Sequence, residues 1–233
     1  MLTLSQSRPG NLLLAALSPA DFKLLNLQLV PLKLRHDLER PNRAIDDVYF
    51  PHVGIASVVA VQSKTVQVEV GLIGYEGMSG TSVVLGIDRS PHSTYMQVEG
   101  EGQRITVADL REAMQARETL RGVLLRYVQV FMVQTAHTAI ANARDRLDRR
   151  LARWILMAHD RVRDTKIPLT HEFLALMLGV RRAGVTEALH SLKIQKLINS
   201  GRGEVILLDR KGLERTAGNA YGTPEAEFRR LIG

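Results

Sequence analysis

The sequence predicts an α+β fold in which an all-β N-terminal unit is followed by a long helix and a mainly helical C-terminal unit. Short β-branched runs broken by turn residues occupy most of the first hundred residues. Residues 108–143 then show helical periodicity and almost no glycine. After them, two helical periods separated by Gly179 precede a pair of short apolar runs. These three observations set the order of elements along the chain.

The composition is that of a globular protein without a membrane span. The 233 residues are 45% hydrophobic and 24% charged, and no run of eighteen apolar residues occurs. The apolar part of the N-terminus is too short for a secretory signal. Because the chain has no cysteine, disulfides, thiolate catalysis and an iron–sulfur cluster are excluded. We therefore expect a cytoplasmic protein with no membrane partner.

The N-terminal unit is predicted to be a small barrel or roll over residues 1–107. Residues 19–30 have the pattern of a short amphipathic helix that begins at Pro19. Residues 48–61, 66–74 and 93–107 are β-branched runs separated by Gly, Pro, Ser and Asp-Arg turns. Several short strands with glycines near the turns are typical of a closed all-β unit.

The long helix is predicted over residues 108–143, which make up the second segment of the chain. Its apolar and small residues recur at alternating spacings of four and three, as in the seam of a coiled coil. The helix is long enough to extend beyond a small barrel, which favours a dimer seam. The alternative is that the same face packs on its own barrel. The candidate dimerisation residues are Leu120, Leu124, Tyr127, Phe131, Gln134 and Thr138.

All of the net positive charge lies in the C-terminal part of the chain. Residues 143–233 contain 18 Lys and Arg against 11 Asp and Glu, whereas residues 1–142 contain 13 of each kind. A basic unit beside a neutral one indicates nucleic-acid binding, although an ordinary basic surface is the alternative. The charged amphipathic helix over 144–163 starts this unit. We place its domain over 144–216 and leave 217–233 as a C-terminal tail.

Residues 169–189 have the pattern of a helix-turn-helix. Thr170 can cap the first helix, and Gly179 supplies the positive φ of a tight turn. Arg181 and Arg182 then begin the second helix, at an end where the helix dipole prefers anions. That placement is reasonable if a polyanion binds there. In this motif the second helix enters the major groove of DNA, where an Arg can pair with guanine.

A predicted β-hairpin follows the two helices and resembles the wing of such a domain. Residues 197–208 read as strand, Ser-Gly-Arg-Gly turn and strand, with Arg202 at the tip within reach of a phosphate. Double-stranded DNA is therefore the predicted partner. The candidate DNA-contacting residues are Thr170, Arg181, Arg182, Gly184, Thr186, Glu187, His190 and Arg202.

An enzyme is disfavoured. The seven histidines show no zinc-site spacing, and the chain has neither a GxxxxGK[ST] nor a GxSxG motif, so no metal or catalytic site is predicted. Two other classes stay open beside a specific DNA-binding regulator. One is a non-specific architectural DNA-binding protein. The other is a ligand-sensing module that acts through protein contacts.

The segments LTHEFLALMLGVRRAGVTEALHSL, RLDRRLARWIL and VEVGLIGYEGMSG together resemble the Crp/Fnr family of bacterial transcription regulators. The resemblance covers nearly the whole chain. It implies an N-terminal β-roll sensor, a double-stranded β-helix of the jelly-roll type that is like a cyclic-nucleotide-binding domain. It also implies a long dimerisation helix and a C-terminal winged helix-turn-helix. Such proteins are homodimers that read pseudo-palindromic sites and recruit or block RNA polymerase.

The sequence also departs from the family pattern. Arg182 matches the first base-reading residue, but Ala183 and Glu187 stand where Glu and a second Arg are common, which implies another half-site. In the sensor no Glu follows the glycine, and His92 replaces the phosphate-binding Arg. These changes argue against cyclic AMP, and no cofactor is predicted. The candidate effector residues are Gly77, Met78, Gly80, His92, Ser93 and Thr94.

Overall fold

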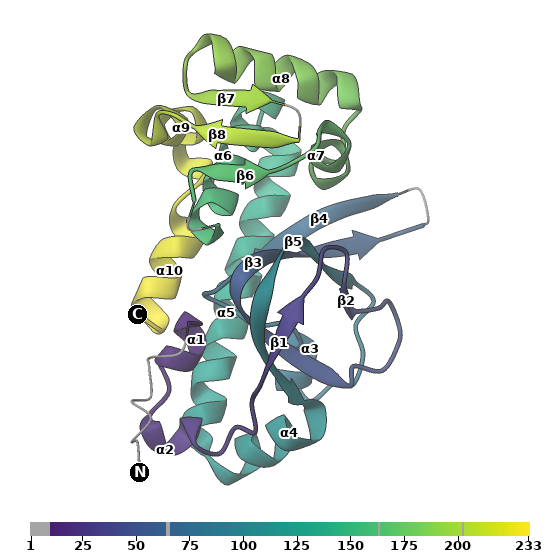
Figure 1. The fold of residues 1–233 in the computed structure, drawn as a ribbon, viewed down its shortest axis with the longest axis vertical. Coiled ribbons are helices and arrows are strands. Elements are labelled where there is room, and N and C mark those ends of the chain that lie inside the picture. The colour runs from purple at the N-terminus through teal and green to yellow at the C-terminus, as the bar shows by residue number, and fades with distance from the viewer. Residues whose placement is uncertain (1–9, 64–65, 163, 202) are drawn as a thin grey trace.

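The computed structural model describes residues 10–63, 66–162, 164–201 and 203–233. A β-roll forms one side of the molecule, a long helix runs beside it, and a helical head with a small sheet lies at one end (Figure 1). The elements of the N-terminal part are α1 (Leu12–Ala15), α2 (Pro19–Phe22), β1 (Gln28–Leu32), β2 (Asp37–Glu39), β3 (Asp47–Val61), β4 (Gln67–Ile73), α3 (Thr81–Val84) and β5 (Ser93–Thr106). Those that follow are α4 (Val107–Ala116), α5 (Glu118–Arg144), α6 (Leu147–Arg161), β6 (Lys166–Pro168), α7 (His171–Leu178), α8 (Arg182–Ile194), β7 (Ile198–Gly201), β8 (Glu204–Leu207), α9 (Arg210–Ala217), the 3₁₀ turn Gly218–Ala220 and α10 (Thr223–Leu231).

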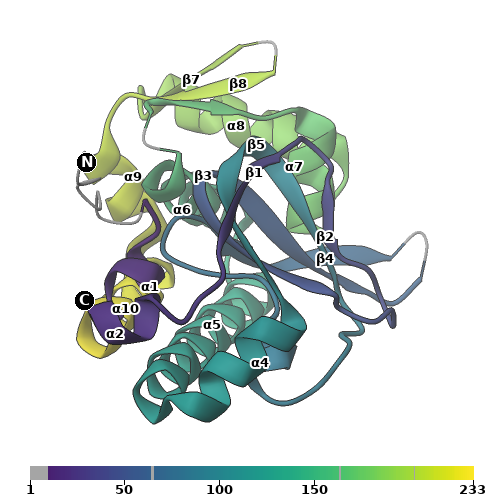
Figure 2. The ribbon, with the colours of Figure 1, turned by 60° about the horizontal axis from the view of Figure 1, so that its bottom comes forward.

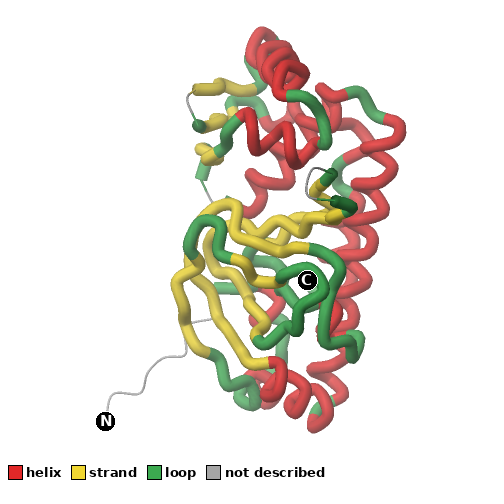
Figure 3. The backbone as a smooth tube through the Cα atoms, turned by 90° about the vertical axis from the view of Figure 1, so that its right-hand side faces the viewer, coloured by secondary structure: helices red, strands yellow, loops and turns green. Residues whose placement is uncertain are grey.

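The β-roll is one antiparallel sheet in the order β1-β5-β3-β4, with β2 also paired to β5. Long strands β3 and β5 pair from Asp47 opposite Thr106 to Val59 opposite Ser93, and bulges between them let the sheet curl. The three strands predicted from β-branched runs are confirmed as β3, β4 and β5. Figure 3 shows these strands on one side of the molecule and the long helices on the other.

The predicted helix over residues 19–30 is wrong in its second half. Helix α2 ends at Phe22, and residues 28–32 instead form edge strand β1, paired with Gly100–Arg104 of β5. Pro31 lies in this strand, where an edge position tolerates a residue without a backbone N–H. Strand pairing with a distant part of the chain has therefore overridden a helical pattern.

The predicted single helix over residues 108–143 is divided into α4 and α5 by an extended residue, Arg117, with φ −139° and ψ 107°. The buried carboxylate of Asp21 holds the break. It accepts hydrogen bonds from Arg117 Nε at 2.8 Å and from the Thr119 hydroxyl at 2.9 Å. Helix α5 therefore starts at a point that is tied to α2.

The face of α5 predicted to be a dimer seam is packed inside the chain itself. Leu120, Leu124 and Tyr127 belong to the apolar core that α5 forms with α1, α3 and α4. The ring of Phe131 lies against Gly71 of β4, so closely that a Cβ at position 71 would stand 2.7 Å from it. The alternative reading, packing on its own barrel, therefore describes this face.

The polar end of the predicted seam is internal as well. Gln134 donates from Nε2 to the Leu72 carbonyl at 3.2 Å and accepts the Leu72 N–H at 2.6 Å, which fastens α5 to the edge strand β4. Thr138 accepts from Arg153 of α6 at 3.1 Å. The exposed apolar side chains of α5 lie on another side: Leu125, Met132 and Ile140.

Residues 217–233 are more than a tail. The 3₁₀ turn leads into α10, which runs back along α5 toward the N-terminal helices (Figure 2). Glu225 accepts from the N–H of Gly222, which secures the start of α10. The C-terminal segment thus covers part of α5 and of the β-roll end.

The close approach of Gly77 to α5 predicts a large cost for adding one methyl group. A Cβ at position 77 would stand 2.1 Å from the Tyr127 hydroxyl oxygen and 2.6 Å from Cζ, and the ring is buried. Gly77→Ala should therefore lower the free energy of unfolding by about 1–3 kcal/mol in urea titrations. Gly122→Ala, in the same helix α5 but without a clash, should raise it by about 0.5–1 kcal/mol. Equal effects of the two substitutions would contradict this packing.

Candidate nucleic-acid interface

The C-terminal head, α6 to α9 with strands β6 to β8, is built around an apolar core that also includes Ile55 and Leu72 of the β-roll. Buried side chains of α6, α7, α8 and the three-stranded sheet β6-β8-β7 converge there, among them Ile155, Leu174 and Leu189. The predicted hairpin is confirmed as β7 and β8, in which Ile198 pairs with Leu207 and Gly201 with Glu204. Strand β6, which pairs with β8, was not predicted from the sequence.

The turn between α7 and α8 forms as the residue pattern predicts. Thr170 is the N-cap of α7, and its hydroxyl accepts the Phe173 N–H at 3.2 Å. Gly179 follows α7 with φ 61° and ψ 38°, the left-handed conformation that a residue without a Cβ adopts at least cost. This turn sets the direction in which α8 leaves α7.

The N-terminus of α8 is exposed and has no side-chain cap. Arg181 is its N-cap residue and accepts no hydrogen bond through its side chain, and the first turn contains no acidic residue. Arg182 is 66% exposed and pairs with Glu172 of α7 at 2.8 Å. Free backbone N–H groups and two guanidinium groups thus meet at one helix end, which is an anion-binding arrangement.

Most of the predicted DNA-contacting side chains are exposed. Thr186 bonds the Arg182 carbonyl and lies 3.0 Å from His171 Nδ1, so it stays close to the start of α8. Arg202 lies outside the described residues. The exposed residues of the predicted set are Thr170, Arg181, Arg182, Thr186, Glu187 and His190.

Gly184, which was also predicted to contact DNA, does not share the exposure of that set. It is half-buried, and a Cβ there would stand 3.2 Å from Leu147 Cδ2 at the start of α6. The absence of a side chain lets α8 approach α6, so Gly184 has a packing role rather than a place on the outer face.

The predicted effector residues lie in three surroundings. Gly77 and Met78 lie against Tyr127 of α5, while His92 and Ser93 are half-buried at the start of β5. Gly80 donates its N–H at 2.8 Å to the carboxylate of Glu39, which is also bonded by Thr94. Burial raises the pKa of Glu39, and these two hydrogen bonds oppose the rise. Sequence reasoning missed Glu39, because a single carboxylate in a short strand has no distinguishing pattern.

A buried carboxylate joins the β-roll to the head. Glu69 of β4 accepts the indole N–H of Trp154 of α6 at 2.6 Å, and its other oxygen lies 2.6 Å from the Ser57 hydroxyl. Burial raises the pKa of Glu69 to about 7, against the lowering effects of these bonds and of Arg153 and Arg161. This contact was also missed, since an acidic residue in a strand reads as solvent-facing.

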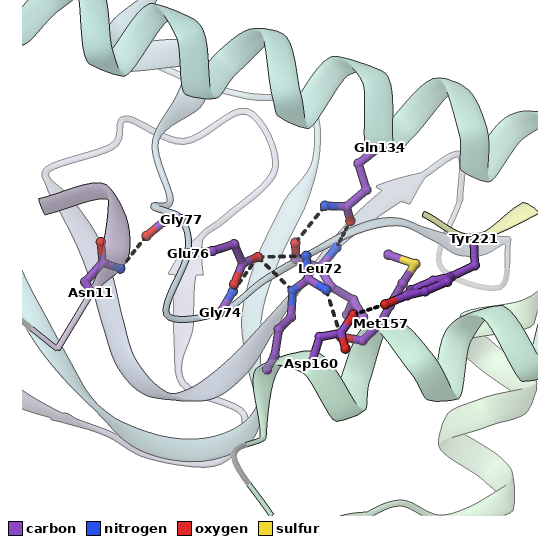
Figure 4. Close-up of polar contacts among 10 residues, drawn as sticks. Asn11, Leu72, Gly74, Glu76, Gly77, Gln134, Met157, Asp160 and Tyr221 are labelled. Carbon is purple, nitrogen blue, oxygen red and sulfur yellow. Dashed lines mark hydrogen bonds and ion pairs between the residues drawn. The ribbon is translucent and has the colours of Figure 1, made fainter. Parts of the chain in front are cut away.

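A second polar cluster lies at the end of α6, and Figure 4 labels Glu76, Met157, Asp160 and Tyr221 in it. Arg161 donates from both Nε and Nη2 to Glu76 Oε1, each at 2.7 Å, and from Nη1 to the Met157 carbonyl. Its neighbour Asp160 accepts from the Tyr221 hydroxyl at 2.5 Å. The turn after β4, the end of α6 and the segment before α10 are thus connected by hydrogen bonds.

The comparisons agree with this geometry. Residues 149–216 match the model of the Crp-like helix-turn-helix domain. A putative Crp/Fnr-family regulator from Eubacterium rectale has a similar fold, with a TM-score of 0.68 and 17% identity over 86% of this chain and 95% of that one. FixK2 from Bradyrhizobium japonicum has a TM-score of 0.70 and 14% identity, over 83% of this chain and 98% of that one. The c-di-GMP responsive regulator CLP from Xanthomonas campestris has a TM-score of 0.65 and 16% identity, over 88% of this chain and 100% of that one. No curated protein sequence matches the chain.

The fold is thus a winged helix-turn-helix, a motif of DNA-binding domains, attached to a β-roll by a long helix. More particularly, residues 149–216 are a Crp-like helix-turn-helix domain, and the described chain has the fold of the Crp/Fnr transcription regulators. The solved structures named above are of transcription regulators rather than enzymes. No helix in the part of the chain that the structure describes is long and apolar enough to cross a membrane.

The raised pKa of Glu69 predicts a pH-dependent stability. The folded chain keeps the Glu69 proton that the unfolded chain loses above its ordinary pKa of 4.5, so the free energy of unfolding falls by up to about 3 kcal/mol as pH rises to about 7. Glu69→Gln mimics the protonated acid and should remove this contribution. Urea unfolding between pH about 5 and about 8 measures the difference.

Glu112→Gln, at an exposed position of α4, is the matched control. The advantage of Glu69→Gln over the wild type should grow with pH, whereas the effect of the control should not change. A pH-independent difference at Glu69 would contradict a proton held at the contact.

Proposed function

We propose that this protein is a homodimeric regulator of transcription that reads a pseudo-palindromic DNA site with α8. The observation that supports this most is the uncapped, exposed N-terminus of α8, which carries Arg181 and Arg182, in a head that also contains a hairpin of two strands. The first turns of such a helix meet base edges in the major groove, and the wing reaches the backbone. Recruitment or blocking of RNA polymerase then changes transcription.

Arg182 is the residue that reads a base, because its guanidinium can pair with both guanine O6 and N7. In the free protein Glu172 holds this side chain over α7. Both side chains of this ion pair are exposed, so the pair contributes little to stability. Arg182 can therefore leave Glu172 for a nucleic-acid partner. Arg181, which has no ion pair among the described residues, is the phosphate contact.

The dimer interface uses the exposed side of α5 rather than the predicted seam. Leu125, Met132 and Ile140 are 37%, 60% and 57% exposed and recur at helical spacing. Gln129 and Ala136 lie between them on the same side and are exposed too. A second copy of α5 packed here would place two heads on one face of the duplex, with half-sites about 34 Å apart.

Regulation acts on the position of the head relative to the β-roll. The contacts of Glu69 with Trp154 and of Glu76 with Arg161 define one arrangement of the two parts. An effector in the β-roll, or the protein's abundance alone, sets how many molecules have their heads aligned for DNA. Gly77 lies against Tyr127, and Gly80 and Thr94 are bonded to the carboxylate of Glu39. These contacts give no support to cyclic AMP as that effector.

Selection of bound duplexes from a random pool tests the function as a whole. We expect enrichment of one two-fold symmetric motif, and an affinity that falls steeply with salt, since phosphate contacts release counterions. Equal retention of all sequences would instead favour an architectural DNA-binding protein. No retention of any duplex would overturn the proposal.

Arg182→Ala should weaken binding to the selected duplex by about 1–3 kcal/mol and relax discrimination at one base pair per half-site. Lys211→Ala, an exposed cation of α9 away from α8, is the matched control and should have little effect. Gel shifts on the selected site and its single-base variants measure both. Full discrimination by Arg182→Ala at every base would exclude this residue as a reader.

Met132→Glu should shift the chain from dimer to monomer, because a carboxylate on each copy would face its like across the interface. Sedimentation equilibrium measures the mass, and gel shifts should show a loss of at least tenfold in DNA affinity. Met132→Leu keeps the apolar surface and should remain dimeric. A dimer that survives Met132→Glu with unchanged affinity would place the interface elsewhere.

A further inference from the structure

A cleft of about 450 Å³ lies between the β-roll and the head. Its walls come from the β1–β2 turn and β5 on one side, and from β6, α7 and Gly203 of the β7–β8 turn on the other. The apolar part of the walls includes Leu34, Val98, Leu169, Phe173 and Leu176. Sites for small molecules have this size and character and are common where two domains meet.

The cleft also has a buried polar group without a partner. Gln97 of β5 is 7% exposed, and its Nε2 has no hydrogen-bond partner among the described residues. Its Oε1 lies 2.6 Å from the Ser57 hydroxyl, which also lies 2.6 Å from Glu69. When Glu69 is protonated it donates to Ser57, which donates to Gln97, so the amide N–H groups stay unused. A buried donor left unsatisfied is costly, and a ligand acceptor would relieve that cost.

The guanidinium of Arg35 and the phenol of Tyr95 lie on the same side of the cleft as Gln97. Arg35 lines the cleft from the β1–β2 turn and has no ion pair among the described residues. Tyr95 beside it keeps its proton at neutral pH, since burial raises its pKa to about 12. Glu99 is the acidic residue of the lining. The donors Gln97, Arg35 and Tyr95 together suit an anionic acceptor attached to an apolar body.

We propose that this cleft binds an organic carboxylate with an aliphatic or aryl body, and that its occupancy controls how the head sits on the β-roll. The apolar body would lie against Phe173 and Leu176 of α7, and the carboxylate would reach Gln97 and Arg35. Thr170, the N-cap of the first helix of the helix-turn-helix, also lines the cleft. A bound molecule would therefore contact both parts at once and change the population of the docked arrangement.

Decanoate and 1-naphthoate are suitable probes, each with its neutral amide as the counterpart. Isothermal titration calorimetry with the full chain should show one site per chain for at least one carboxylate, and binding at least tenfold weaker for its amide. Trp154, the single tryptophan, lies edge-on to Phe173 at 6.5 Å, so its emission should change on binding. Absence of binding by both carboxylates would overturn the proposal.

Variants locate the bound molecule. Arg35 has φ 61°, which Asn tolerates, so Arg35→Asn removes the cation without backbone strain and should raise Kd at least tenfold. Leu34→Asp, at a side chain 56% exposed, should do the same through charge repulsion. Arg43→Asn, an exposed arginine outside the cleft, should bind as wild type. Unchanged binding in both cleft variants would overturn the site.

Glu99→Gln tests the sign of the ligand's charge. Carboxylate binding should be equal or tighter in this variant, and weaker binding would contradict the assigned polarity.

The regulatory part of the proposal, that the ligand controls the position of the head, rests on the proposed function and has its own measurement. Decanoate or 1-naphthoate should change affinity for the selected duplex at least fivefold, and an unchanged affinity would overturn that part alone. Because calorimetry needs no DNA, a chain that binds the carboxylate and no duplex would separate the two failures.

Discussion

A buried guanidinium that must be paired determines how the two halves of this molecule meet. Arg161 ends α6 inside the protein, where an unpaired charge would be costly, and Glu76 in the turn after β4 supplies the carboxylate. The Met157 carbonyl takes one of its remaining N–H groups. Since the pair joins the head to the β-roll, breaking it would leave two charges without partners. The relative position of the two parts is therefore set by polar chemistry as well as by apolar packing.

The contact between Glu69 and Trp154 has a different character. A charged Glu69 is poorly solvated in its surroundings, so its pKa rises to about 7 and the proton is lost or kept near neutral pH. The Arg161 pair holds the two parts together through charge, whereas burial favours neutral Glu69 even though its hydrogen bonds with Ser57 and Trp154 favour the charged form. Because burial of Glu69 in the docked arrangement keeps a proton that the unfolded chain loses, the stability of this arrangement depends on pH.

The sequence predicted the elements whose conformation depends on residues close by in the chain. The N-cap Thr170, the left-handed Gly179 and the strands β3 to β5 follow from residue type and spacing. Elements that depend on distant partners were missed: β1 forms only because β5 pairs with it, and the break at Arg117 depends on Asp21. The same holds for the site. Exposure of Arg182 was predictable from helical periodicity, but the packing of Gly184 on Leu147 was not.

Helix α5 shows why a seam-like pattern can be covered by the chain itself. A helix with apolar residues at alternating three and four spacings has a continuous stripe, and the stripe alone does not say which surface covers it. In this chain the stripe through Leu124 and Tyr127 covers the protein's own core, and a second, weaker stripe through Leu125, Met132 and Ile140 is left exposed. Since α10 occupies another side of α5, that stripe is left open for the second copy that we propose. A helix packed on its β-roll, on α10 and on its own copy would transmit a change at any one of these surfaces to the other two.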